Sequence, residues 1–231
     1  MMEPPGRLAP PLDSACISRR RCLQHGSATG LLSLLASVGG LGCVAMFGET
    51  AHAGGQLEEP LADSVRTALT SAVSNRAPPV PQFNNAESRL AYQRWSSLMA
   101  TRLVRLIPEA HNRQEFSQTV WYESQRAGLD LSLVLGLIEV ESHFRKFAVS
   151  SVGARGFMQV MPFWVRLIGD GDVSKLFHLQ TNLRFGCVIL RHYLDREQGD
   201  VFMGLGRYNG SRGQAPYPEA VLAARKKWQL A

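Results

Sequence analysis

Apolar residues in the middle of the chain recur with the period of an α-helix. Spacings of three and four hold over 86–107, 112–127 and 131–144, and this pattern predicts three amphipathic helices. Pro108 ends the first pattern, and Gly128 stands where the second would stop. We interpret the apolar stripes as core, and the first two consist mainly of Tyr92, Trp95, Met99, Leu103, Leu106, Phe116, Val120 and Trp121.

The remaining helical pattern lies in the C-terminal third. Two further helices are predicted over 182–194 and 218–228, the second with a proline in its first turn. Glycines punctuate a loop-rich stretch over 153–171 and predict a second, glycine-rich loop over 204–213. There is no internal repeat and little strand pattern, so the predicted fold class is mainly α.

The segment 54–84 lacks the helical pattern of the middle of the chain. It is polar, and prolines between 78 and 81 interrupt it after a short helix predicted over 61–73. A linker and a packed N-terminal arm both fit this pattern. A helical extension is expected over 85–107 and the main domain over 108–231.

The first 53 residues have the layout of a signal peptide. Three consecutive arginines at 19–21 precede an uncharged stretch over 26–48, and Ala51-His52-Ala53 supplies the small residues that a leader peptidase requires. Cleavage is predicted after Ala53, with an uncleaved membrane anchor as the alternative. The arginines fit twin-arginine export or an ordinary basic leader. We therefore expect export to the periplasm.

Net charge limits the classes of binding partner, and the cysteines and histidines limit the kinds of site. The formal net charge is +6 at pH 7, and the basic residues are scattered along the chain. This suits an anionic cell-wall polymer and equally a solvated surface, whereas dispersed charge and predicted export argue against a nucleic-acid partner. Cys187, which lies beyond the leader, has apolar neighbours that predict burial. No pair of histidines four residues apart stands beside an acid, so no metal site is predicted.

One carboxylic acid lies on an apolar helix face. Asp130 is placed to cap the helix over 131–144, and Glu141 falls on the same stripe as Ile138. Burial disfavours the charged form and raises the pKa of a carboxyl group, as a general acid working near neutral pH requires. Glu139, rotated by about 200° from Glu141, is expected to face solvent. Helix geometry alone favours a structural glutamate over a catalytic one.

The residues after this acid have an ordered pattern. Glu141-Ser142-His143-Phe144 is followed by Ser150-Ser151-Val152-Gly153-Ala154-Arg155-Gly156-Phe157-Met158-Gln159-Val160-Met161-Pro162. This order closely resembles the signature of the soluble lytic transglycosylase (SLT) family, which has a lysozyme-like fold. The resemblance covers about 108–228 and continues with Asn182-Leu183, Gly186, Arg207-Tyr208-Asn209-Gly210 and Tyr217.

Two positions depart from the family pattern. The family usually has Ala before the Tyr-Asn pair and Ala-Gly after it, where this chain has Arg207 and Gly210-Ser211. The family's final Tyr-Val reads Tyr217-Pro218 here. These departures concern the shape of the loop and the role of Tyr217.

The resemblance implies a set of site residues. Glu141 would be the catalytic acid and base, and the implied substrate-binding residues are Ser150, Gln159, Met161, Tyr208, Asn209 and Tyr217. Ser150 and Gln159 would hydrogen-bond N-acetyl or hydroxyl groups, and Met161 would lie beneath a sugar ring. Tyr208 and Asn209 would flank the reacting sugar. No metal and no cofactor is implied.

The resemblance also implies the reaction. Glycosidases normally pair two carboxylates, yet the nearest later acids, Asp170 and Asp172, lie in a loop interpreted as a solvated turn. In the family's reaction one glutamate protonates the oxygen between N-acetylmuramic acid and N-acetylglucosamine. It then deprotonates the muramic C6 hydroxyl, which closes on C1 to leave a 1,6-anhydro end.

Alternatives stay open for activity and partners. A lysozyme-type hydrolase would attack the same bond with water, and a non-catalytic module would bind the wall without cutting it. The expected partner is the glycan strand of peptidoglycan. The sequence leaves open envelope or secretion-apparatus proteins as further partners, and also the oligomeric state.

Overall fold

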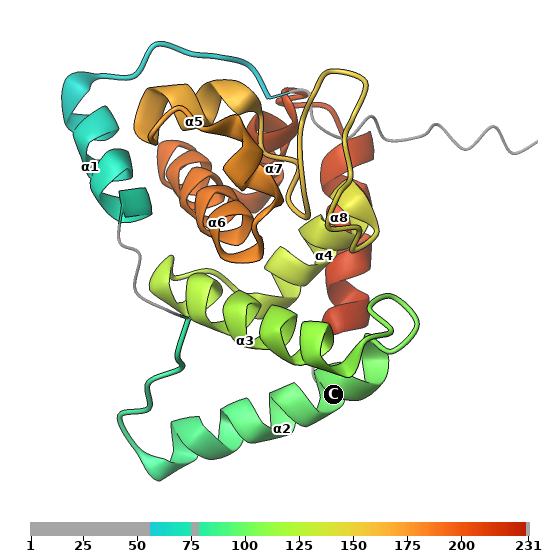
Figure 1. Ribbon diagram of the computed structural model, residues 1–231. Coiled ribbons are helices and arrows are strands. Elements are labelled where there is room, and N and C mark those ends of the chain that lie inside the picture. The colour runs from blue at the N-terminus through green and yellow to red at the C-terminus, as the bar shows by residue number, and fades with distance from the viewer. Residues whose placement is uncertain (1–55, 75–78, 230–231) are drawn as a thin grey trace, which may run out of the picture. The chain divides into compact units, whose positions relative to one another are not determined.

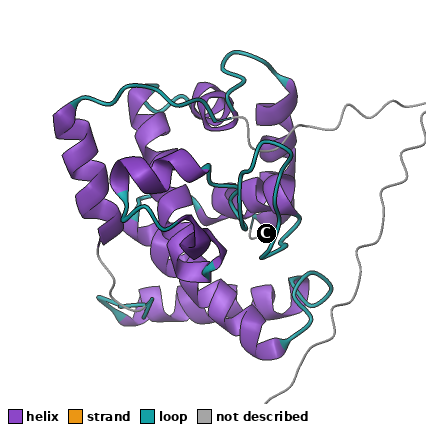
Figure 2. Cartoon of the chain, turned by 45° about the horizontal axis from the view of Figure 1, so that its top comes forward, coloured by secondary structure: helices purple, strands orange, loops and turns teal. Residues whose placement is uncertain are grey.

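The computed structural model describes residues 56–74 and 79–229. In this part of the chain helices joined by loops account for the fold (Figure 2), and extended pairing is limited to isolated bridges of Arg155 with Val149 and Val160. The mainly α prediction is confirmed. The elements are α1 (Asp63–Ser74), α2 (Ala86–Arg102), α3 (Ala110–Arg126), α4 (Leu131–Ser142), α5 (Pro162–Ile168), the 3-10 helix η1 (Val173–Phe177), α6 (Leu179–Arg196), α7 (Val201–Asn209) and α8 (Pro216–Trp228).

Helix α4 contributes a continuous run of buried residues to the core. Its residues 132–138 are buried, and the Oδ1 of Asp130 caps it by accepting from the backbone nitrogen of Leu133 at 2.7 Å. Helix α8 packs along α4 (Figure 1). The two backbones approach closely at Gly136, where a Cβ would lie 2.6 Å from the backbone nitrogen of Arg225. The middle of α4 is thereby held close to α8.

Glu139 does not face open solvent, so this prediction is wrong. Its Oε2 accepts from Nε1 of Trp228 at 2.6 Å, and its Oε1 accepts from Nζ of Lys227 at 2.7 Å. The end of α8 covers this side of α4, which the periodicity of α4 alone does not reveal. Glu139 therefore stabilises the packing of the two helices.

A buried ion pair joins α3 to α6. Nε and Nη2 of Arg184 donate to the Oε1 of Glu123 at 3.0 and 2.8 Å, and Nε of Arg126 donates to its Oε2 at 2.9 Å. Both carboxylate oxygens are thus occupied, which offsets the cost of burying the charges. Cys187 is buried as predicted, and burial raises the pKa of its thiol, as does the charge of Glu123 to a smaller extent.

Residues 56–74 pack against the domain as an arm. Leu69 and Val73 of α1 are buried in the hydrophobic core, and α1 contacts α5 and α6 (Figure 1). Arg126 adds a hydrogen bond from Nη1 to the carbonyl oxygen of Ala72 at 2.6 Å. The described part of the segment 54–84 is therefore held on the domain.

The predicted glycine-rich loop over 204–213 is wrong in its first half. Helix α7 runs through Gly204 and Gly206 to Asn209, and the turn begins at Gly210 with φ of 79°. A Cβ on Gly204 would lie 2.6 Å from Cδ2 of Leu194, so this glycine allows close helix packing. Glycines that serve packing and glycines that serve turns look alike in a sequence.

Other boundaries differ by less. The helix expected over 86–107 ends at Arg102, and α5 lies inside the stretch expected to be loop-rich. The helix expected over 131–144 ends at Ser142, because His143 and Phe144 adopt left-handed backbone conformations with φ of 50° and 60°.

The predicted signal peptide and its cleavage after Ala53 lie outside the described residues. Over 56–74 and 79–229, no helix has both the length and the apolar character needed to cross a membrane.

Candidate active site

Glu141 lies in the last turn of α4 with its side chain turned into the protein, as the apolar stripe predicts. The residue is 5% exposed. Burial raises the pKa of its carboxyl group from 4.5 to about 8, although a hydrogen bond from Tyr217 acts in the opposite direction. The group is therefore mostly protonated at neutral pH, as a general acid must be.

Tyr217 contacts this acid directly. Its hydroxyl donates to Oε1 of Glu141 at 2.6 Å, and the tyrosine is 2% exposed. Helix α8 begins at Pro216, so Tyr217 and Pro218 occupy its first turn, where backbone N–H groups have no partner within the helix. The proline that departs from the family pattern is thus compatible with the helix that positions Tyr217.

The loop between α4 and α5 carries Ser150 and Gln159. Gln159 is buried with a left-handed φ of 47°, and its Nε2 donates to the carbonyl oxygens of Gly156 at 2.9 Å and Ala148 at 3.1 Å. Oγ of the half-buried Ser150 accepts from the backbone nitrogen of Ala154 at 3.0 Å. Both side chains therefore hold the loop in shape, in addition to any contact with a sugar.

Asn182 of α6 holds the same loop by hydrogen bonds to its backbone. The sequence pattern did not reveal this role. Its Oδ1 accepts from the backbone nitrogen of Met158 at 2.9 Å, and its Nδ2 donates to the carbonyl oxygens of Arg155 at 2.8 Å and Leu176 at 2.9 Å. A polar asparagine at the start of an apolar helical pattern was the available signal, and the structure leaves it 1% exposed. Gly186, one turn later, leaves room for the Met158 side chain, whose Sδ would lie 2.3 Å from an added Cβ.

Tyr208 and Asn209 end α7 and have different surroundings. Tyr208 is fully buried, and its hydroxyl donates to the carbonyl oxygen of Met158 at 2.7 Å. Burial and the nearby charge of Glu141 raise the pKa of Tyr208 well above its usual value. Nδ2 of Asn209 donates to Oγ of Ser211 at 3.0 Å. Tyr208 thus supports the loop, and Ser211, where the family has glycine, orients the amide of Asn209.

Met161 precedes α5 and meets the N-terminal arm. The methionine is half-buried, and its backbone nitrogen donates to Oε1 of Gln56 at 3.4 Å. Gln56 is 4% exposed and begins the described part of the arm. The sequence offered no signal for this contact, because Gln56 lies in a polar segment without periodicity.

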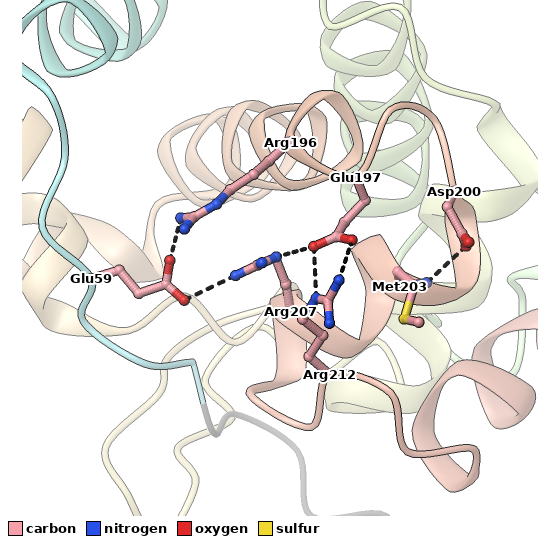
Figure 3. Close-up of polar contacts among 7 residues, drawn as sticks. All are labelled: Glu59, Arg196, Glu197, Asp200, Met203, Arg207 and Arg212. Atoms are coloured by element: carbon pink, nitrogen blue, oxygen red, sulfur yellow. Dashed lines mark hydrogen bonds and ion pairs between the residues drawn. The ribbon is translucent and has the colours of Figure 1, made fainter.

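Arg207, at the first departure from the family pattern, has acidic partners on both sides. Its Nη1 lies 3.1 Å from Oε1 of Glu59 in the arm, and its Nε is hydrogen-bonded to Glu197 (Figure 3).

Asp170 and Asp172 are exposed and form ion pairs with Lys175. Asp172 also caps η1 by accepting from the backbone nitrogen of Ser174 at 3.1 Å. The interpretation of a solvated turn is confirmed.

Comparisons with known proteins found a matching family model, sequence relatives and a similar solved structure. Residues 118–229 match the family model described as Transglycosylase SLT domain. The "Transglycosylase" of Enterobacteria phage PRD1 is 36% identical over 98 residues, which cover 42% of this chain and 36% of the phage protein. "Membrane-bound lytic murein transglycosylase C" of Haemophilus ducreyi is 34% identical over 105 residues, with 39% of this chain and 29% of that protein covered.

The matched region spans about a third of these relatives, since 36% and 29% of their lengths are covered. Among solved structures, an inactive mutant of lytic transglycosylase Slt from Pseudomonas aeruginosa is similar with a TM-score of 0.43 and 20% identity. That similarity covers 75% of this chain and 38% of the other.

Proposed function

Because residues 118–229 of this chain belong to the transglycosylase SLT domain family, we propose that it cleaves peptidoglycan glycan strands as a lytic transglycosylase. The bond broken joins N-acetylmuramic acid to N-acetylglucosamine, and Glu141 acts first as general acid and then as general base. The observation that carries this proposal is the buried carboxyl group of Glu141 with its raised pKa.

The two oxygens of Glu141 support an acid step. Oε1 accepts from the Tyr217 hydroxyl, while Oε2 is buried and has no hydrogen-bond partner among the described residues. In the protonated acid, Oε2 is therefore the atom suited to carry the proton and to donate it to the glycosidic oxygen. The bond from C1 to that oxygen breaks, and N-acetylglucosamine leaves with the proton.

A base step by the same group completes the reaction. The Glu141 carboxylate removes the proton of the muramic C6 hydroxyl, and the C6 oxygen bonds to C1. The hydrogen bond from Tyr217 stabilises the carboxylate between the two steps. No water is consumed, and the acid returns to its protonated form with a 1,6-anhydro end as product.

The intervening positive charge needs a stabilising group. Asp170 and Asp172 are exposed and paired with Lys175, so neither is suited to act as a second buried carboxylate. We infer that the acetamido oxygen of the substrate serves instead, ordered by Asn209 and Ser150. Met161 and the loop that Gln159 and Tyr208 support would form the surface beneath the sugar ring.

The place of action is inferred from the substrate and the leader. Peptidoglycan lies outside the inner membrane, and the N-terminal layout indicates export. We propose the periplasm, with glycan strands as the binding partner. Two curated relatives carry the name of a membrane-bound lytic murein transglycosylase.

Digestion of purified peptidoglycan tests the proposal. The wild-type protein should release muropeptides with 1,6-anhydro ends, identified by mass, and Glu141→Gln should release none. Glu139→Gln on the same helix is the control and should stay active. Reducing muramic ends from the wild type would indicate a lysozyme-type hydrolase, and binding without any product would indicate a wall-binding module.

A further inference from the structure

A chain of charged side chains fastens the arm to α6 and α7 (Figure 3). One carboxylate oxygen of Glu59 pairs with Arg196 at the end of α6, and the other lies 3.1 Å from Nη1 of Arg207 in α7. Arg207 also pairs with Glu197, whose two oxygens accept from Arg212 at 2.9 Å each. We call these five residues the arm clasp.

The arm clasp includes two residues that lie close in sequence to residues of the candidate active site. Arg207 immediately precedes Tyr208 and Asn209, and Glu59 lies three residues after Gln56. Three residues of chain span at most about 10 Å, so a fixed Glu59 confines Gln56 to the surroundings of α7. The side chains of Arg207 and Glu59 are 18% and 31% exposed, so solvent screens these pairs only in part.

Gln56 is held against two residues of the candidate active site. Its Oε1 accepts from the backbone nitrogen of Met161 at 3.4 Å, and its amide lies near the Tyr208 hydroxyl. Its Nε2 is buried and makes no hydrogen bond of normal geometry among the described residues. Burial raises the pKa of the Tyr208 hydroxyl, and a weak side-chain hydrogen bond from Gln56 acts to lower it. A buried amide donor without a partner is unfavourable, and native proteins rarely keep one without a use.

Two polar atoms of other candidate site residues also lack partners in the described part of the chain. Oε2 of Glu141 and Oδ1 of Asn209 are buried without hydrogen-bond partners among the described residues. Asn209 is next to Tyr208 in the chain, and the charge of Glu141 acts on the Tyr208 hydroxyl. The Nε2 donor of Gln56 beside Tyr208 and the Oε2 acceptor of Glu141 match a ligand that offers both kinds of group, as an N-acetylated sugar does.

We propose that Gln56 is a substrate-binding residue, whose Nε2 donates a hydrogen bond to an acetamido or hydroxyl oxygen of the glycan strand, and that the arm clasp presents it. The class of ligand rests on the proposed function. The N-terminal arm is then a part of the active site that the SLT domain region, 118–229, does not contain.

Two substitutions of Gln56 test the contribution of its Nε2 donor. Gln56→Glu keeps an oxygen for the Met161 N–H and removes Nε2, whereas Gln56→Met keeps most of the volume and removes both polar atoms. With soluble, uncrosslinked peptidoglycan strands as substrate, each should raise KM about 3- to 10-fold, the value of one hydrogen bond. The kcat should change less than about twofold, because Gln56 takes no part in proton transfer.

The clasp is tested by Glu59→Gln beside Glu58→Gln. Glu58 is the exposed neighbour and has no ion pair among the described residues, so its variant should behave as the wild type. Glu59→Gln should raise KM about as much as Gln56→Met does. In the double variant the two effects should combine to less than their product, because both act through the same amide.

The outcomes separate this inference from the proposed function. Unchanged or lowered KM in both Gln56 variants, or a fall in kcat alone, would overturn the role of Gln56. Hydrolytic products from the wild type would overturn the transglycosylase proposal. The ratio of variant to wild-type KM would still test the role of Gln56. If the wild type shows no turnover, co-sedimentation with sacculi measures the same ratios as dissociation constants.

Discussion

A single pair of side chains, Glu141 and Tyr217, sets the expected pH dependence of activity. The proposed acid step requires protonated Glu141, so kcat/KM should fall as the pH rises through about 8. The Tyr217 hydrogen bond lowers this pKa, so Tyr217→Phe should raise it and move the alkaline limb to higher pH. The same variant should lose about tenfold in kcat, because the carboxylate of the base step loses its donor.

Rates of anhydro-product release between pH 5 and 10 would measure both effects. Tyr122→Phe in α3 removes a hydroxyl elsewhere in the domain and serves as the control. An alkaline limb that moves to lower pH in Tyr217→Phe would contradict the assignment.

Burial of Glu141 should also reduce stability at alkaline pH. Its pKa is 4.5 when exposed and about 8 in the fold, so the folded state binds the extra proton and is favoured at low pH. As the pH rises from 4.5 to 8 this contribution is lost, by up to about 4 kcal/mol at about 1.4 kcal/mol per pH unit. Glu141→Gln should therefore match the wild type near pH 5 and exceed it near pH 8.5.

Urea unfolding at these two pH values would measure the difference in the free energy of unfolding. The exposed Glu58→Gln is the control, and it should be as stable as the wild type at both pH values. A wild type as stable as Glu141→Gln at pH 8.5 would mean that the carboxyl group is not desolvated.

At the scale of elements, periodicity predicted α2, α3, α4, α6 and α8 but missed α5 and α7. The stripe of α4 and the inward direction of Glu141 were predicted because side-chain spacing fixes them. Helix α7 was missed because Gly204 suggests a turn until Leu194 is seen against it. The contacts of Gln159 and Asn182 with loop carbonyls join residues 11 and 6 positions apart, and helical periodicity does not encode them.

Two glycines of one loop separate backbone strain from steric overlap. Gly153 and Gly156 both have left-handed φ, of 86° and 77°. Alanine at either position should cost about 1–2 kcal/mol in strain. At Gly156 the new Cβ would also lie 2.6 Å from the carbonyl oxygen of Leu176 and 2.3 Å from Nδ2 of Asn182, whereas nothing lies within 4 Å at Gly153.

Gly156→Ala should therefore be the more destabilising and should lower activity by displacing the loop that carries Ser150 and Gln159. Gly153→Ala is its matched control. Thermal unfolding and product release would measure the two effects, and equal losses in both variants would show that strain alone decides.

At the scale of the whole molecule, the sequence predicted a helical domain with one buried acid but left the arm undecided. Composition describes 54–84 as polar and proline-bearing, and a free linker has the same composition. The arm is fastened by Leu69 and Val73 in the core and by Glu59 at α6 and α7. Partners of this kind become visible only when distant segments are placed together.

If the arm belongs to the domain, it should contribute to the stability of the whole. Leu69 is 8% exposed in the core, while Leu57 of the same arm is 61% exposed. Leu69→Ala should lower the free energy of unfolding by about 2 kcal/mol and the Tm by about 4–8 °C, whereas Leu57→Ala should change stability by less than about 0.5 kcal/mol. Circular dichroism should follow a single transition in both variants. An unchanged Tm in Leu69→Ala, or a separate early transition of the arm, would mean that the arm detaches independently, and the clasp at Glu59 alone would then hold Gln56 in place.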